Sequence, residues 1–276
     1  MTAMLLILAA AASGQAPGPK ADAPAQAAAR LSAMKAAAGG YEFAREAGPI
    51  RLQPEPAFRL GNQSNGVLEG AIFLWNDKDG RPEAAAQVFL HRDRAFPEGK
   101  WIHEFTSLST TPMTASRKGA VRWSPDGPGV TFRGLPGAPK PAATPAQRLR
   151  QMRALAEEFK AEDDFGAEGR IVALRLLTTP VARYGKAGAT PEDGALFAFV
   201  EGTDPEVFLF VEARPGKDGL EWQYACAPMS CWPLKATHKG RIVWEVPRRW
   251  PDNPSRTFFS LDDLPETESV KAEASR

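Results

Sequence analysis

Apolar residues recur at helical spacing near the middle of the chain. The apolar face of a predicted helix is formed by residues three or four positions apart: Leu149, Met152, Leu155 and Phe159. Thr144 and Pro145 precede it as an N-cap and a first-turn proline. A smaller version of this face lies earlier in the chain, at Ala28, Leu31, Met34 and Ala38. The pattern therefore predicts one amphipathic helix in each half of the chain.

Most of the chain after the second predicted helix has the pattern of β-strands. Turn sequences rich in Gly, Pro and Asp separate the extended segments 171–184, 195–201, 207–213, 220–229, 234–237 and 241–246. Val207–Val211 is apolar at every position, which is typical of a strand covered on both faces. Short connections between successive strands favour an antiparallel meander.

The two halves of the sequence match each other. Lys100–Pro112 aligns without a gap with Glu221–Pro233, so that Trp101 meets Trp222, 121 residues further on. Ser109 meets Ser230 within this stretch, and shorter matches flank it, among them Glu69–Phe73 with Asp193–Phe197, Pro82-Glu83 with Pro205-Glu206, and Trp123 with Trp244. Self-similarity at a fixed offset indicates an internal duplication.

We therefore predict an α+β fold, a tandem duplication of a helix followed by a curled antiparallel β-meander of about six strands. The predicted units are residues 24–136 and 145–265, with linkers at 15–23 and 137–144 and a polar tail at 266–276. This order of elements resembles the cystatin-like and nuclear-transport-factor-like architectures. The resemblance carries no motif, so it implies no activity.

The N-terminus has the pattern of a secretory signal. Met4–Leu8 and the alanines that follow form an apolar stretch too short to span a bilayer, and small residues lead to Gln15. We predict a signal peptide at residues 1–14 and a periplasmic or extracellular protein. No later stretch approaches 18 apolar residues, so we expect no membrane span.

Charge and motifs exclude several classes of function. Lys plus Arg number 34 and Asp plus Glu 33, and this near-neutral balance provides no basic footprint for nucleic acid. The chain contains no G-x-S-x-G elbow, P-loop or Rossmann fingerprint, and its three histidines have no metal-ligand spacing. We therefore assign no catalytic residue, metal or cofactor.

The candidate binding residues recur in both halves. Arg59 precedes Glu69 by ten residues, and Arg183 precedes Asp193 by ten. If each stretch is a hairpin, the two charges lie opposite each other, either as a surface ion pair that sets the register or at a cleft that binds an acidic ligand.

Large aromatic residues offer a second candidate. Trp101 and Trp222 fill the core or line a stacking platform for a ligand, and the sequence leaves both roles open. The pair Cys226 and Cys231 also stays open, because a disulfide between them requires a turn at Pro228.

These observations favour an exported, non-enzymatic binding or scaffold module whose partner is an unknown protein or small molecule. The alternative is a hydrolase or small-ligand carrier with its site in the cleft between the two units.

Overall fold

The computed structural model describes residues 23–165 and 170–265. The predicted signal peptide and C-terminal tail lie outside these described residues. Within them the chain forms 18 β-strands and only two α-helices, so the fold is mostly β.

The first half of the chain contains one helix and nine strands. These are α1 (Ala23–Gly39), β1 (Tyr41–Ala44), β2 (Arg51–Leu52), β3 (Phe58–Asn62), β4 (Val67–Asn76), β5 (Pro82–His91), β6 (Lys100–Ser107), β7 (Thr114–Arg117), β8 (Ala120–Trp123) and β9 (Arg133–Gly134), with a 3₁₀ turn at Gln63–Asn65.

The second half also contains one helix and nine strands. These are α2 (Pro145–Glu157), β10 (Phe159–Asp164), β11 (Ile171–Leu176), β12 (Ala182–Tyr184), β13 (Asp193–Glu201), β14 (Asp204–Gly216), β15 (Gly219–Pro228), β16 (Leu234–His238), β17 (Arg241–Val246) and β18 (Phe258–Pro265).

Helix α2 begins where the sequence predicts. The Thr144 side chain accepts a hydrogen bond from the Gln147 N–H, and Pro145 occupies the first turn. Met152 and Leu155, which belong to the helix, are buried against the sheet. Phe159 is not part of it, because the helix ends at Glu157 and Phe159 begins β10.

The described strands form three antiparallel sheets. Their orders are β1-β7-β8, then β18-β6-β5-β4-β2 with β3 beside β4, and β17-β16-β10-β11-β13-β14-β15-β9 with β12 beside β13. The central ladder β4-β5-β6 after α1 has the same order as β13-β14-β15 after α2.

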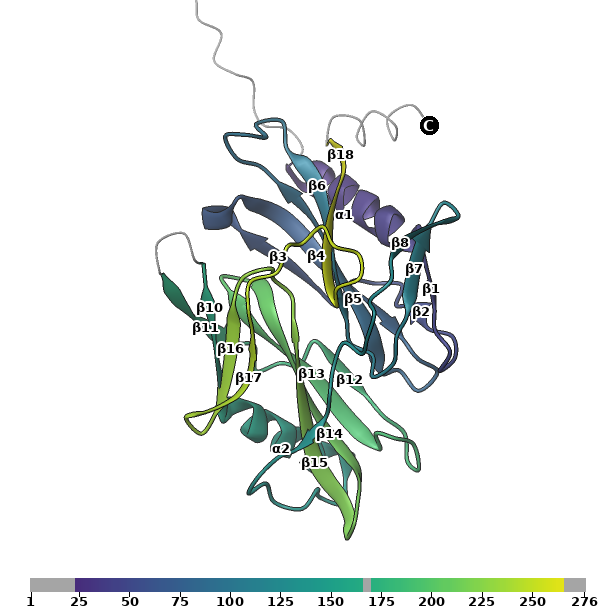
Figure 1. Ribbon diagram of the computed structural model, residues 1–276, viewed down its shortest axis with the longest axis vertical. Helices are drawn as coiled ribbons and strands as arrows, with labels where there is room; N and C mark the ends of the chain where they lie inside the picture. The colour runs from purple at the N-terminus through teal and green to yellow at the C-terminus, as the bar shows by residue number, and fades with distance from the viewer. Residues whose placement is uncertain (1–22, 166–169, 266–276) are drawn as a thin grey trace, which may run out of the picture.

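The last strand of each half pairs with the sheet of the other half. β18 pairs with β6, where Phe259 lies opposite Phe105, and β9 pairs with β15, where Arg133 lies opposite Tyr224. Figure 1 shows the yellow β18 running along β6.

The predicted fold class is therefore wrong. The chain does not consist of two copies of a helix followed by a six-strand meander. Instead, β1 pairs with β7 and β10 pairs with β16, and the final strand of each half pairs with a strand of the other half. The physical reason is that alternating hydrophobicity marks a strand and its buried face, whereas the partner of a strand depends on contacts distant in sequence.

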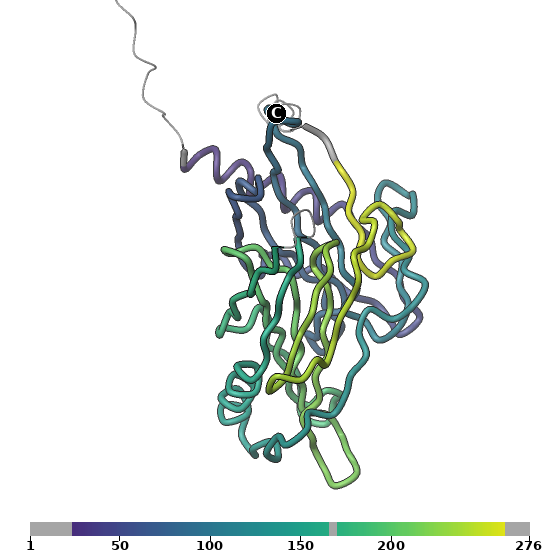
Figure 2. The backbone as a smooth tube through the Cα atoms, turned by 60° about the vertical axis from the view of Figure 1, so that its left-hand side comes forward, coloured from purple at the N-terminus to yellow at the C-terminus, as the bar shows by residue number. Residues whose placement is uncertain are grey.

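The two large sheets pack face to face with a helix on each outer side. Helix α1 lies against β4 and β5, and α2 lies against β13 and β14, as the two views show (Figures 1 and 2). On β4, Phe73 faces the α1 side while Ile72 and Leu74 face the core between the sheets. On β13, likewise, Phe197 faces the α2 side and Leu196 faces the core between the sheets. The middle parts of these strands, Ala71–Trp75 and Ala195–Val200, are apolar because both of their faces are covered.

Candidate functional site

The predicted Arg–acid pairs both form. Arg59 makes an ion pair with Glu69, and the Arg183 guanidinium lies 2.6 Å from Asp193. They are not directly opposite on the ladder, because Arg59 faces Ala71 and Arg183 faces Ala195. Each pair is diagonal, which long side chains can bridge.

Each acid of these pairs also binds a helix. Arg30 of α1 donates to Glu69 at 2.7 Å, and Arg148 of α2 donates to Asp193 at 2.8 Å. In each half, therefore, one carboxylate binds two arginines, and it attaches the helix of that half to the sheet beneath it. This arrangement serves the fold, since both acids have their charge satisfied within the chain.

The two tryptophans of the matched stretch lie in the core. Trp101 on β6 is 4% exposed and Trp222 on β15 is 2% exposed, so neither offers a ring face as an open stacking platform. They hold corresponding places, opposite Leu90 on β5 and Ala213 on β14. Their indole N–H groups have no hydrogen-bond acceptor within the described residues.

The cysteines and histidines form no reactive set in the described parts of the chain. Cys226 and Cys231 are both free thiols. Each histidine has an ordinary partner: His91 contacts Asp93, His103 contacts the Tyr41 hydroxyl, and His238 contacts Glu158.

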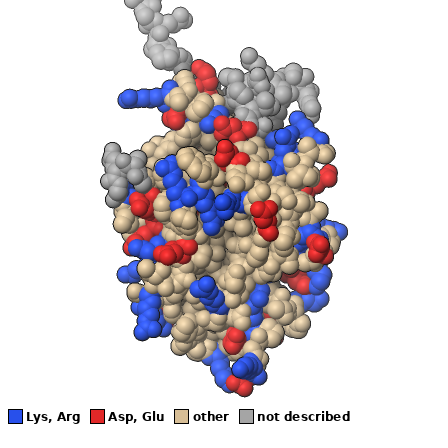
Figure 3. All heavy atoms as spheres, viewed as in Figure 1, with Lys and Arg blue, Asp and Glu red and all other residues tan. Residues whose placement is uncertain are grey.

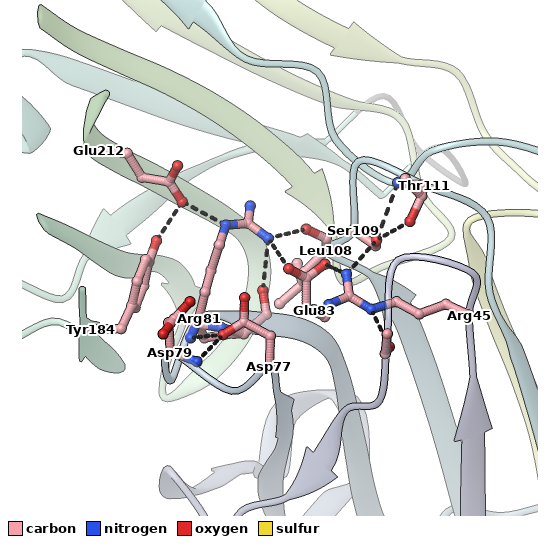
Figure 4. A network of polar contacts seen from close by, with 12 residues as sticks. Arg45, Asp77, Asp79, Arg81, Glu83, Leu108, Ser109, Thr111, Tyr184 and Glu212 are labelled. Carbon is pink, nitrogen blue, oxygen red and sulfur yellow. Dashed lines mark hydrogen bonds and ion pairs between the residues drawn. The ribbon is translucent and has the colours of Figure 1, made fainter. Parts of the chain in front are cut away.

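An unpredicted group of charges lies buried between the two sheets (Figure 4). The Arg81 guanidinium lies 2.9 Å from Glu83 on one side and 2.9 Å from Glu212 of β14 on the other. Glu83 also contacts Arg45 at 2.7 Å, and the Tyr184 hydroxyl donates to Glu212 at 2.8 Å. We call these five residues the arginine cluster.

The charges of the arginine cluster compensate one another. Burial acts to lower the pKa of Arg81, but the Glu212 carboxylate and its neighbours raise that pKa above its ordinary value. Burial, and then the negative charge of Glu212, raise the pKa of the Tyr184 hydroxyl. The cluster therefore consists of paired ions and a neutral phenol.

The position that matches Arg81 in the second half carries the opposite charge. Arg81-Pro82-Glu83 corresponds to Asp204-Pro205-Glu206, so an acid replaces the arginine. The backbone places them alike: the Leu108 N–H donates to the Glu83 carbonyl, and the Met229 N–H donates to the Glu206 carbonyl.

The second arginine is replaced as well. Ala44 pairs with Thr114, and Glu162 pairs with Lys235, which lies 121 residues after Thr114. The next residue along the chain is Arg45 in the first case and Asp163 in the second. Both arginines that hold Glu83 thus have acids as their counterparts around Glu206.

Four acids approach one another at this second position. Asp163, Asp204 and Glu206 come from the second half, and Glu104 comes from β6 of the first. We call them the carboxyl cluster. No Lys, Arg or His in residues 23–165 and 170–265 forms an ion pair with any of them, in contrast to Glu83 and Glu212.

The absence of a compensating cation changes how these groups ionise. Burial raises the pKa of Asp163 and Asp204 to about 7 and that of Glu104 to about 8, with the Asp204 charge adding to the effect on Glu104. Burial and then the charges of Asp204 and Asp163 raise the pKa of Glu206 well above its ordinary value.

Three acids of the carboxyl cluster, Glu104, Asp204 and Glu206, border a cavity of about 230 Å³. Its lining combines acids and polar groups with apolar and aromatic side chains: Asn65, Val67, Gln87, Phe89, His91, Ile102, Glu104, Phe165, Asp204, Glu206, Met229, Ser230, Cys231 and Trp232. We call this the carboxyl pocket. Both halves of the chain contribute to it.

One polar atom in the lining of the carboxyl pocket lacks a hydrogen-bond partner in the described structure. The Gln87 side chain donates to Asp204 at 2.7 Å, yet its carbonyl oxygen Oε1 is buried without a donor. Asp163 interacts with Glu206 and Ser230 and is not part of the cavity lining. Unsatisfied acceptors in a cavity are suited to a ligand that brings hydrogen-bond donors.

The sequence contained a sign of this site. The match of Pro82-Glu83 with Pro205-Glu206 is visible in the chain, and the residues before it differ in charge, Arg81 against Asp204. Only the folded structure shows that both positions are buried and that Glu104 joins the second.

No helix among the described residues is both long and apolar enough to cross a membrane. The same residues contain no group of three or more His, Cys, Asp or Glu side chains placed to hold a metal ion. Comparisons with protein-family models, with curated proteins and with solved structures find no match to this chain.

Proposed function

We propose that the chain is a binding protein whose ligand inserts an organic cation, a guanidinium or an ammonium group, into the carboxyl pocket. One observation carries this proposal: the two arginines that hold the buried Glu83 are replaced by acids around Glu206. A ligand cation would supply the missing positive charge.

The arginine cluster indicates the chemistry that fits such a position. There the Arg81 guanidinium lies between two carboxylates and 4.7 Å from the centre of the Phe210 ring. The carboxyl pocket likewise offers acids together with the aromatic residues Phe89, Phe165 and Trp232. Carboxylates and aromatic faces both attract organic cations.

The uncompensated acids supply the driving force. Several buried carboxyls cannot all ionise without a cation, so without ligand they retain protons. A ligand with several N–H donors would pair with the ionised acids and satisfy the free Gln87 oxygen. Binding should therefore release protons and strengthen as the pH rises from 5.5 to 8.5.

Titration calorimetry with two matched probes tests this function. Butylguanidine carries the cation, and N-butylurea has nearly the same shape without the charge. We expect butylguanidine to bind at least about tenfold more tightly at pH 8.5, because the carboxylates discriminate by charge-assisted hydrogen bonds.

Variants of the site and a matched control complete the test. Asp204→Asn should weaken butylguanidine binding, whereas Glu157→Gln, an exposed acid on α2, should not. Equal binding of the two probes, or none of either by a folded protein, would refute the proposed function.

Export from the cell is also part of the proposal. The apolar stretch of residues 4–8 and the small residues after it support export of this binding protein. Mass spectrometry of secreted protein should find an N-terminus near Gln15; retention of Met1 would contradict export through a cleaved signal.

A further inference from the structure

Arginines lie on the aromatic wall of the carboxyl pocket. Phe165 and Trp232 both line the cavity, and their ring centres are 5.8 Å apart. The Arg248 guanidinium lies 4.2 Å from the centre of the Trp232 ring, and Arg170 lies 5.5 Å from that of Phe165. The pocket thus has acids within and positive charge beside its aromatic residues.

Arg248 differs from Arg170 in its availability. Arg170 forms an ion pair with Glu201 at 3.4 Å. Arg248 is exposed, and within the described residues it has neither an ion pair nor a hydrogen bond from its guanidinium. Its contacts are with aromatic rings, Trp232 and the exposed Trp250, so its N–H donors remain free for an anion.

The backbone fixes Arg248 beside the pocket. The N–H of the next residue, Arg249, donates to the carbonyl of Cys231, which lines the cavity. Arg249 and Arg256 add positive charge to the same segment between β17 and β18. Figure 3 shows Lys and Arg gathered in the upper centre of the face where this segment runs in Figure 1.

The two kinds of charge lie close enough for one small molecule. The Cys231 thiol is within electrostatic range of both Glu104 and Arg248, whose opposite charges shift its pKa in opposite directions. Glu104, Cys231 and Trp232 line the same cavity, and the Arg248 guanidinium lies 4.2 Å from the centre of the Trp232 ring, so the acids of the pocket and this arginine are neighbours.

We infer that the ligand is a small zwitterion, whose cation enters the carboxyl pocket and whose carboxylate binds the Arg248 guanidinium. This inference rests on the proposed function and adds the second charge. The planar guanidinium presents paired N–H donors that match a carboxylate. The rings on which Arg248 is stacked hold it in place, which lowers the entropic cost of binding.

A series of probes with the same cation tests the inference. Titration calorimetry at pH 8.5 compares butylguanidine with 3-guanidinopropionate, 4-guanidinobutyrate and 5-guanidinopentanoate. We expect one of the three carboxylates to bind roughly tenfold more tightly than butylguanidine, because a charge-assisted, bidentate contact adds to the affinity only at the matching length.

Substitution at Arg248 separates this inference from the proposed function. Arg248→Gln should abolish the preference for the carboxylate probe, measured as the ratio of its affinity to that of butylguanidine in the same variant. Arg248→Lys should keep part of the preference, and Arg241→Gln, an exposed arginine on β17, should keep all of it.

Wild-type protein that binds butylguanidine but gains nothing from any added carboxylate would overturn the inference and leave the proposed function standing. A carboxylate preference that survives Arg248→Gln would also overturn it. Failure to bind butylguanidine and all three carboxylate probes would refute both.

Discussion

Arg81, which precedes β5, and Glu212 of β14 form an ion pair of 2.9 Å across the interface between the two sheets. Arg81 is 4% exposed and Glu212 is fully buried. Charges at this depth are stable only when each has its partner, because burial removes the water that would otherwise solvate them.

Arg81→Met should therefore destabilise the protein strongly. Removal of the cation leaves the buried carboxylates of Glu212 and Glu83 without a charge partner in common. Loss of one member of a buried ion pair lowers the free energy of unfolding by about 3–5 kcal/mol. Urea unfolding should show the loss, and Arg241→Met on the exposed face of β17 provides the control. Adding Glu212→Gln to Arg81→Met should restore part of the stability; a small effect of the single variant would contradict the account of the cluster.

Asp193→Asn should loosen α2 from its sheet. The Asp193 carboxylate is 5% exposed as a side chain and accepts from both Arg148 and Arg183, so loss of its charge weakens two ion pairs. We expect a loss of about 2–3 kcal/mol from hydrogen bonds to a buried charge. Hydrogen exchange should increase in α2 more than in α1.

Glu69→Gln is the matched comparison in the first half. Its partner Arg59 is 40% exposed as a side chain, so water already screens that contact. We expect a smaller loss in the free energy of unfolding: at most about 1 kcal/mol from the exposed pair with Arg59, together with a contribution from the lost contact with Arg30. Equal losses in the two variants would show that burial does not decide the strength of these pairs.

Stability should fall as the pH rises from about 4 to 8. The pKa values of Asp163 and Asp204 are raised to about 7 and that of Glu104 to about 8, chiefly by burial. Unfolded carboxyls titrate near pH 4, so in this interval the folded protein binds more protons than the unfolded chain, and the free energy of unfolding decreases with pH.

Asp204→Asn removes one of these titrations and should flatten the profile. Each such carboxyl contributes at most about 1.4 kcal/mol per pH unit across its interval. Urea unfolding of the wild type, Asp204→Asn and the control Glu157→Gln between pH 4.5 and 8.5 measures the difference. Parallel profiles for all three proteins would show that the carboxyl cluster does not hold protons.

Two hairpin turns offer a route to higher stability. Lys118 and Lys239 adopt φ values of 52° and 50°, each followed by a glycine of positive φ in a two-residue turn. Asparagine tolerates this left-handed conformation better than lysine, so Lys118→Asn should add about 0.5 kcal/mol. Lys239→Asn should add less, because it also removes the ion pair of Lys239 with Glu158 at 3.1 Å. Thermal unfolding should show the gain, and Lys217→Asn in a turn without positive φ at that residue should show none.

The hydrophobic pattern predicted many elements because it reports on local geometry. The strands expected at 195–201 and 241–246 are β13 and β17, and the start expected at Pro145 is that of α2. Burial on one face repeats every two residues in a strand and every three or four in a helix, so these positions are visible in the chain.

The functional residues were less visible. Trp101 and Trp222 are conspicuous in the sequence because tryptophan is rare in this chain. Large aromatic residues occur in cores as readily as in ligand sites, however, and here both are buried. Glu104 gave no sign at all, since an acid on a strand is ordinarily exposed. Its importance comes from Asp204, which lies 100 residues away in the chain and beside it in the fold.

The sequence by itself determined many of the strands, the start of α2, the Arg–acid spacing of ten residues and the match of Pro82-Glu83 with Pro205-Glu206. Each of these is a local property, set by a few neighbouring residues. Only the tertiary structure decided that β9 and β18 pair with the opposite halves and that four acids meet without a cation. Strand partners and buried charges depend on contacts between distant segments, and the free energy of an acid is set by what surrounds it after folding.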